Sequence, residues 1–181
     1  MAMPPMLAYS IQTDPPTVRV GLGTDMAHIR PDNPQQNSYW IVFISAQNPK
    51  QKVKEWVIPA SQNSTVPAGI EDFMNNPAYI FILATQGLAT MQLPQGNFYN
   101  FLVKYGAGPK LQRMEQRIQM MGCGAFGSTR YILTGKCGPR GPGSISYEAG
   151  YGDDGVLLMS LMPMPNGQPP YGICDSYTFK H

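Results

Sequence analysis

Few residues of the sequence have the chemistry and the spacing that catalysis requires. The two histidines are His28 and His181, and the second is the last residue of the sequence. A Ser-His-Asp or Cys-His catalytic unit would therefore depend on His28, which lies in an irregular stretch. We expect that the protein is not an enzyme and has no hydrolase or transferase activity.

The remaining polar motifs predict turns and helix ends rather than cofactor sites. Asp153-Asp154 stands in a glycine loop but lacks the alternating oxygen ligands of a calcium loop. Gly135-Lys136-Cys137-Gly138 lacks the long glycine-rich approach and the Lys-Ser/Thr pair of a nucleotide-binding P-loop. Glu71-Asp72 suits the first turn of a helix, where negative charge is favourable. No Cys/His spacing fits structural zinc, so we expect no metal and no cofactor.

Three cysteines do not define a disulfide framework. Cys123 and Cys137 flank one predicted strand, and Cys174 lies near the end of the sequence. The favoured interpretation is three free, buried thiols, because cysteine behaves as a small apolar residue. One disulfide with one free thiol is the alternative.

Charge is sparse but unevenly distributed. Only 13% of residues are charged and the net charge is +2, which gives no overall electrostatic footprint for nucleic acid. Between Lys104 and Arg140 there are seven basic residues and one acid, Glu115, whereas residues 141–181 contain four acids and one lysine. The favoured interpretation is a basic helix face beside an acidic tail. The alternative is a basic patch that binds a phosphate, a sulfate or an acidic glycan.

Hydrophobic patterning predicts an ordered unit between residues 38 and 141. The uninterrupted apolar run 78–85 predicts a central strand covered on both faces. Residues 38–59 predict a hairpin with its turn at Asn48-Pro49-Lys50-Gln51.

Two helices and a further strand follow the central strand. A helix over 98–105 would be capped by Asn97, and a second would begin at Pro109 and leave at Gly122. Residues 129–135 predict the further strand. Together these elements predict an α+β fold, with a mixed or antiparallel sheet and short helices packed on it.

The two end segments predict arms rather than domains. Residues 1–37 are rich in proline and methionine, with one strand candidate at 17–22. Residues 142–181 predict a hairpin of 144–149 with 156–162 and a tail, packed on the core or on a neighbouring subunit. These segments hold too few regular elements for a second core, so we expect the 38–141 unit to fold without residues 1–16. Their apolar residues, which include Met6, Val18, Val20 and Leu22, then favour contacts between subunits of a homo-oligomer. The alternative is that both segments fold back over their own domain.

The hydrophobic blocks and glycines of the 38–141 unit follow a defined order. A strand at Tyr39-Trp40-Ile41-Val42-Phe43-Ile44 precedes a second strand at 53–58, a short helix at Ile70-Glu71-Asp72-Phe73-Met74 and the central strand. A helix ends in Met121-Gly122-Cys123, and Tyr131-Ile132-Leu133-Thr134-Gly135-Lys136-Cys137-Gly138 closes the unit. This order resembles the ILEI/PANDER-type domain, also called the GG domain. The chain has Gln86-Gly87-Leu88 where that family often has an acidic pair.

The resemblance implies a class of function and a place for the site. Domains of this type are extracellular signalling or glycan-associated modules, which implies a non-catalytic binding module. A glycan groove would lie near residues 86–95 and the corner at 122–130. We predict that a glycan or acidic ligand contacts the polar and basic residues Gln86, Gln92, Lys110, Arg113, Arg117 and Arg130.

A second hypothesis treats the protein as a structural subunit. Low charge and proline-rich ends favour a homo-oligomeric assembly, such as a filament, capsid or tail component. The mass of the native particle in solution would separate the two hypotheses. The sequence assigns no compartment: residues 1–7 do not form a signal peptide, and no apolar run is long enough for a membrane span. Export by another route, loss of a leader and a cytoplasmic location all stay open.

Overall fold

The computed structural model describes residues 6–11, 15–121, 128–141, 144–150, 156–163 and 169–175. In chain order the described elements are β1 (Met6–Ile11), β2 (Thr17–Leu22), β3 (Asp25–Ile29), β4 (Ser38–Ser45), β5 (Lys52–Pro59), η1 (Ala60–Gln62), α1 (Ile70–Met74), β6 (Tyr79–Gln86), β7 (Leu88–Ala89), η2 (Thr90–Gln92), α2 (Gly96–Lys104), α3 (Pro109–Met121), β8 (Ser128–Thr129), β9 (Ile132–Lys136), β10 (Ser146–Ala149), β11 (Val156–Pro163) and β12 (Tyr171–Asp175).

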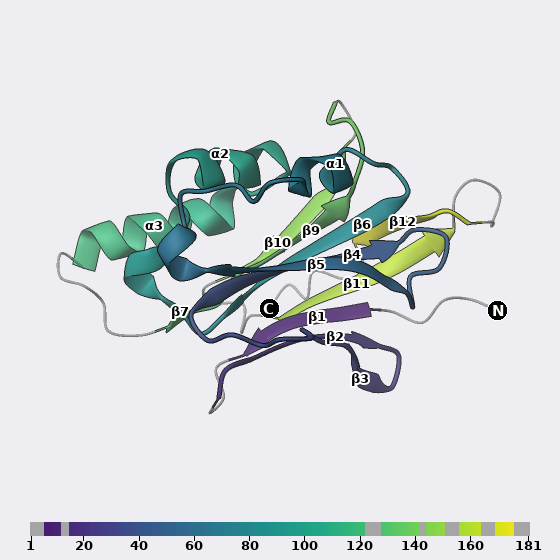
Figure 1. Cartoon of the computed structure of the whole chain (residues 1–181), viewed down its shortest axis with the longest axis horizontal. Coiled ribbons are helices and arrows are strands. Elements are labelled where there is room, and N and C mark those ends of the chain that lie inside the picture. The colour runs from purple at the N-terminus through teal and green to yellow at the C-terminus, as the bar shows by residue number, and fades with distance from the viewer. Residues whose placement is uncertain are drawn as a thin grey trace.

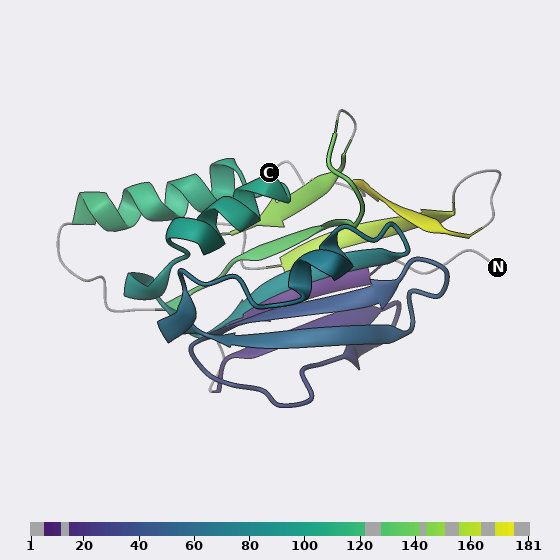
Figure 2. The ribbon, with the colours of Figure 1, turned by 45° about the horizontal axis from the view of Figure 1, so that its top comes forward.

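The elements form three layers (Figure 1). An inner sheet has the strand order β10-β9-β6-β4-β5, and an outer sheet has the order β12-β11-β1-β2-β3. The helices cover the face of the inner sheet that is turned away from the outer sheet (Figure 2). All described strand pairs are antiparallel. This arrangement confirms the predicted α+β fold and shows that its sheets are antiparallel.

Strand β6 lies at the centre of the inner sheet, as its sequence predicts. Ile82 is opposite Val42 of β4 on one side and Thr134 of β9 on the other. Successive side chains of a strand point to opposite faces. Ile82 therefore joins the core between the sheets, whereas Phe81 and Leu83 join the core beneath the helices. An unbroken apolar run is the pattern expected for a strand that is covered on both faces.

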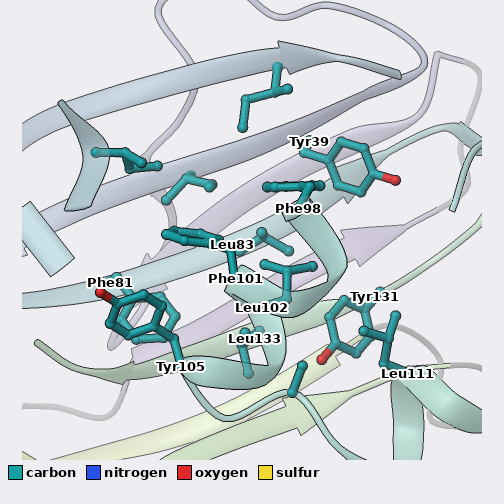
Figure 3. Close-up of a cluster of buried hydrophobic side chains, with 14 of the residues drawn as sticks. Tyr39, Phe81, Leu83, Phe98, Phe101, Leu102, Tyr105, Leu111, Tyr131 and Leu133 are labelled. Atoms are coloured by element: carbon teal, nitrogen blue, oxygen red, sulfur yellow. The ribbon is translucent and has the colours of Figure 1, made fainter. Parts of the chain in front are cut away.

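The core beneath the helices is rich in aromatic rings (Figure 3). Phe98 of α2 meets Tyr39 of β4 edge to face, with ring centroids 5.0 Å apart. Phe101 makes the same kind of contact with Tyr105, also at 5.0 Å. The hydroxyl of Tyr105 donates a hydrogen bond to Asn75 Oδ1 at 3.0 Å, which ties the end of α2 to the end of α1. These contacts fix α2 on the sheet.

The two end segments form the outer sheet together, which was not predicted. Strands β1, β2 and β3 come from residues 1–37, and β11 and β12 come from residues 142–181. The inner side of this sheet buries Met6, Val18 and Val20 against Trp40 of the inner sheet. The prediction that these segments cannot form a second core was therefore wrong. The outer sheet forms only because strands of the two segments pair with each other.

The predicted hairpin of 144–149 with 156–162 was also wrong. Strand β10 pairs with β9 in the inner sheet, whereas β11 pairs with β1 and β12 in the outer sheet. The two segments are consecutive strands, but each completes a different sheet. A hairpin pattern in the sequence cannot distinguish these two outcomes, because both need only two short strands with a loop between them.

The structure describes the state of one of the three cysteines. Cys137 is a buried free thiol, and burial raises its pKa to about 12. A thiol with so high a pKa is a poor nucleophile at neutral pH. Cys123 and the side chain of Cys174 lie outside the described part of the chain.

None of the described helices is long and apolar enough to cross a bilayer.

Candidate functional site

A groove of about 460 Å³ runs between the loop after η1 and helix α2. The loop supplies one wall and the exposed side of α2 the other, and α1 closes one part of the rim. The groove is lined by Ser64, Thr65, Val66, Glu71, Asn97, Asn100, Phe101 and Lys104. We refer to it as the polar groove.

Two hydrogen bonds hold the loop against the start of α2. The side-chain amide of Asn63 donates to the carbonyl oxygen of Leu93 at 2.8 Å, and the backbone N–H of Gln95 donates to the carbonyl oxygen of Asn63 at 2.8 Å. The residues that follow Asn63 are thereby set beside the first turn of α2. A polar surface built from two distant segments is thus held in a fixed geometry.

Four polar side chains of the groove have no hydrogen-bond partner among the described residues: Ser64, Thr65, Asn97 and Asn100. All four are exposed. The sequence predicts that Asn97 caps α2, but the helix begins at Gly96, with Gln95 in the capping position. The amide of Asn97 is therefore free to meet a ligand. It lies three residues from Asn100, so both amides stand on one side of the helix.

An ion pair stands at one part of the groove. Lys104 Nζ lies 3.1 Å from Glu71 Oε1, and both side chains are about half exposed. The hydrogen bond to Glu71 raises the pKa of Lys104, so the lysine stays charged over the physiological range. Lys104 Nζ also lies 5.2 Å from the centroid of the Tyr105 ring. Exposed ion pairs contribute little to stability, so this pair can exchange partners with a ligand at small cost.

The groove combines the polar groups that suit a neutral, hydroxyl-rich ligand. Amides and hydroxyls both donate and accept hydrogen bonds, as do the hydroxyl groups of a sugar. Val66 adds apolar surface on which the C–H face of a sugar ring can rest. Convergent polar groups over apolar surface are typical of small-molecule sites.

The two glutamines predicted to bind ligand lie elsewhere. Gln86 is 3% exposed, and its side-chain amide donates to the carbonyl oxygen of Pro16 at 3.4 Å. This burial removes Gln86 from the candidate ligand-binding residues. Gln92 is half-buried, and its side-chain oxygen accepts a hydrogen bond from Asn37 at 3.2 Å. Both glutamines therefore serve contacts within the chain.

The four predicted basic residues do not line the polar groove. Lys110 is half-buried at the start of α3, where its backbone N–H donates to the carboxylate of Glu148. Arg113 is exposed on α3, and Arg130 is half-buried after β8. Arg117 belongs to α3, but its side chain lies outside the described part of the chain, as does the 122–127 part of the predicted corner.

The candidate catalytic histidine is committed to structural contacts. His28 Nδ1 lies 3.2 Å from Asp25 Oδ2, and His28 Nε2 lies 3.0 Å from the carbonyl oxygen of Lys50. Both ring nitrogens are therefore engaged, and no serine, threonine or cysteine of the described residues contacts the ring. The described residues also contain no group of three His, Cys, Asp or Glu side chains that could hold a metal ion. Asp153-Asp154 lies outside the described residues.

Comparisons of the chain with protein-family models, curated proteins and solved structures gave no match. The resemblance to the ILEI/PANDER-type domain therefore stays a prediction. The polar groove escaped sequence reasoning because its walls lie about thirty residues apart in the chain. The only local signal was a pair of asparagines on the exposed side of a helix, and such pairs are common on surfaces.

Proposed function

We propose that the protein is a non-catalytic carbohydrate-binding module and that the polar groove binds the sugar. The observation that carries the proposal is the pair of amides, Asn97 and Asn100, that line one groove with the hydroxyls of Ser64 and Thr65, all four without a hydrogen-bond partner among the described residues. The resemblance stated above supports the same class of ligand. The groove is open, which suits a sugar within a longer chain as well as a single sugar unit.

The alternative, a structural subunit of a homo-oligomeric assembly, loses part of the argument that motivated it. Four of the apolar residues assigned to subunit contacts are buried within the chain itself: Met6, Val18, Val20 and Leu22. Buried residues of one chain cannot form an exposed patch for another. Homo-oligomeric assembly stays a prediction, and light scattering on the native particle tests it.

The test of carbohydrate binding is a glycan array followed by calorimetry on the sugars that bind. The variant Asn97→Ala/Asn100→Ala removes both amides from the groove. We expect it to weaken binding by about tenfold or more, because each lost hydrogen bond contributes about 0.5–1.5 kcal/mol. The matched control is Asn33→Ala, which removes an exposed, unpartnered amide outside the groove.

Two results would contradict the proposal. One is an array without any bound sugar. The other is equal affinity in the double variant, the Asn33→Ala control and the unaltered protein. A loss of binding in Arg113→Ala/Arg130→Ala, with none in Asn97→Ala/Asn100→Ala, would instead move the site to the basic residues predicted from the sequence.

A further inference from the structure

A second groove, of about 350 Å³, lies beyond the C-terminal end of α2. The glycine-rich segment after β9 forms most of its wall, and the start of β12 contributes the rest. It is lined by Lys136, Cys137, Gly138, Pro139, Arg140, Gly141, Ser144, Ile145, Gly172 and Ile173. The lining contains two cations and no acidic residue. We refer to it as the cationic groove.

Neutral acceptors hold the guanidinium of Arg140 in place. Its Nε donates to the carbonyl oxygen of Lys104 at 3.3 Å, Nη1 donates to the carbonyl oxygen of Lys136 at 3.5 Å, and Nη2 donates to Ser146 Oγ. Arg140 Cζ also lies 5.6 Å from the centroid of the Tyr105 ring. These contacts use three of the five N–H groups of the guanidinium. The other two N–H groups have no hydrogen-bond acceptor among the described residues.

The charge of Arg140 has no counter-ion among the described residues. Burial lowers the pKa of Arg140. The ionisable neighbours that affect this pKa are Cys137 and Tyr105, and neither is a carboxylate. Arginine nevertheless stays protonated in proteins. A half-buried cation without a counter-ion costs folding free energy, and a bound anion would offset part of that cost.

Lys136 adds a second unpaired cation to the same groove. It is the last residue of β9, it is half-buried, and its side chain forms no hydrogen bond or ion pair with the described residues. Lys52, which is also partly buried, differs in this respect, because it pairs with Asp32 at 2.6 Å and with Glu55 at 3.2 Å. Both cations line the cationic groove, and positive charges there attract carboxylate, sulfate or phosphate groups.

The two grooves adjoin at the end of α2. The side chain of Lys104 lines the polar groove, while its carbonyl oxygen holds Arg140 in the cationic groove. Both cations also lie against the ring of Tyr105, at 5.2 Å for Lys104 and 5.6 Å for Arg140. Ile145, 46% exposed, supplies an apolar rim to the cationic groove.

We propose that the cationic groove is a binding site for the carboxylate or sulfate group of an acidic sugar. Arg140 offers its two free N–H groups to the anion, and Lys136 adds a flexible ammonium group. Only the choice of a sugar as the carrier rests on the proposed function above. The recognition of an oxyanion rests on the cationic groove alone.

The test is a titration of the whole chain with sodium glucuronate, glucose 6-sulfate and neutral methyl glucoside, followed by NMR and calorimetry. We expect the two anions to shift the backbone amide signals of Gly138, Gly141 and Gly172, and the neutral sugar to leave them unchanged. Binding should weaken with added salt, because salt screens charge interactions. The comparison of glucuronate with glucose 6-sulfate shows whether the natural ligand is a uronic acid or a sulfated sugar.

Lys136→Ala should weaken anion binding by about tenfold or more, because it removes one charge-assisted contact. Arg140→Lys should also weaken binding, because lysine cannot offer a planar pair of N–H groups. The matched control is Lys50→Ala, which removes an exposed lysine on the β4–β5 turn and should leave affinity unchanged. Lys136 has no partner in the described structure, so its variant should fold even if the Arg140 variant does not.

The proposal is overturned if neither anion binds, or if Lys136→Ala and the unaltered protein bind both anions equally. Anion binding without neutral-glycan binding would leave this site standing and reject the polar groove as the sugar site. The reverse result would reject this site and leave the polar groove.

Discussion

At the scale of single residues, Gly106 shows how closely helix α2 approaches strand β10. Its φ is +111°, and a Cβ atom at this position would lie 2.3 Å from Cβ of Ser146. Ser146 cannot move freely, because its Oγ donates to the carbonyl oxygen of Tyr105 at 2.9 Å and accepts from Arg140. We expect Gly106→Ala to lower the free energy of unfolding by roughly 1–3 kcal/mol, from backbone strain and overpacking. Urea denaturation measures the change.

Gly108 provides the matched control, two residues further along the chain. Nothing lies within 4 Å of a Cβ atom built on Gly108. Gly108→Ala should therefore leave the free energy of unfolding nearly unchanged. Equal destabilisation by both variants would show that the close contact at Gly106 is not the cause.

Glu148 shows how the backbone of Lys110, a predicted ligand residue, takes part in the fold. The Glu148 carboxylate accepts hydrogen bonds from the backbone N–H groups of Gly108 and Lys110 at the start of α3, and from the hydroxyl of Tyr131. Burial raises the pKa of Tyr131, so its hydroxyl remains a donor. A carboxylate near a helix N-terminus is electrostatically favourable. It anchors α3 to β10 and fixes the backbone of Lys110.

At the scale of the elements, strand β6 is the one whose disruption should unfold the protein. Ile82 is fully buried between the sheets and pairs with residues of β4 and β9. Ile82→Asp would place a carboxylate there without a partner, at a cost of about 3–5 kcal/mol or more. We expect this variant to lose cooperative melting. Circular dichroism, including its near-ultraviolet signals, measures this loss.

Val53→Asp is the control for the position of the charge. Val53 is 36% exposed on the edge strand β5, so the new carboxylate would stay in water. This variant should melt nearly as the unaltered protein does. A cooperatively melting Ile82→Asp variant would show that β6 is not the central strand.

The sequence predicted the elements whose signals are local. The apolar run of β6 and the turn between β4 and β5 both lie within short windows. Helix α3 begins at Pro109 as predicted, because proline suits the first turn of a helix. Each of these elements is specified by its own residues and their immediate neighbours.

The outer sheet and the polar groove depend on contacts between distant segments, and the sequence did not reveal them. In β1, burial alternates from Met6 through Ala8 to Ser10, but small and polar residues make this alternation a weak signal. Strand β3 lies at the edge and is mostly exposed. The polar groove likewise needs the loop at Ser64 to be held against α2, through a hydrogen bond that spans thirty residues.

At the scale of the whole molecule, the two ends of the chain meet in one sheet. Strand β1 lies between β2 and β11, so it joins the N-terminal strands to the C-terminal strands. Leu7 of β1 is opposite Gly21 on one side and Leu158 on the other. Because β1 also packs over the inner sheet, its loss would affect both sheets.

This position leads to an expectation opposite to the one drawn from the sequence. Deleting residues 1–16 removes β1, which splits the outer sheet and exposes the face that buries Trp40 and Ile82. We expect the truncated chain to lose cooperative melting, because the buried apolar area that stabilises the inner sheet would face water. A deletion of residues 1–5, which removes no residue of β1, is the control and should melt cooperatively. Calorimetry and light scattering on both chains decide the matter: a cooperatively melting, monomeric chain without residues 1–16 would show that the 38–141 unit folds without the outer sheet.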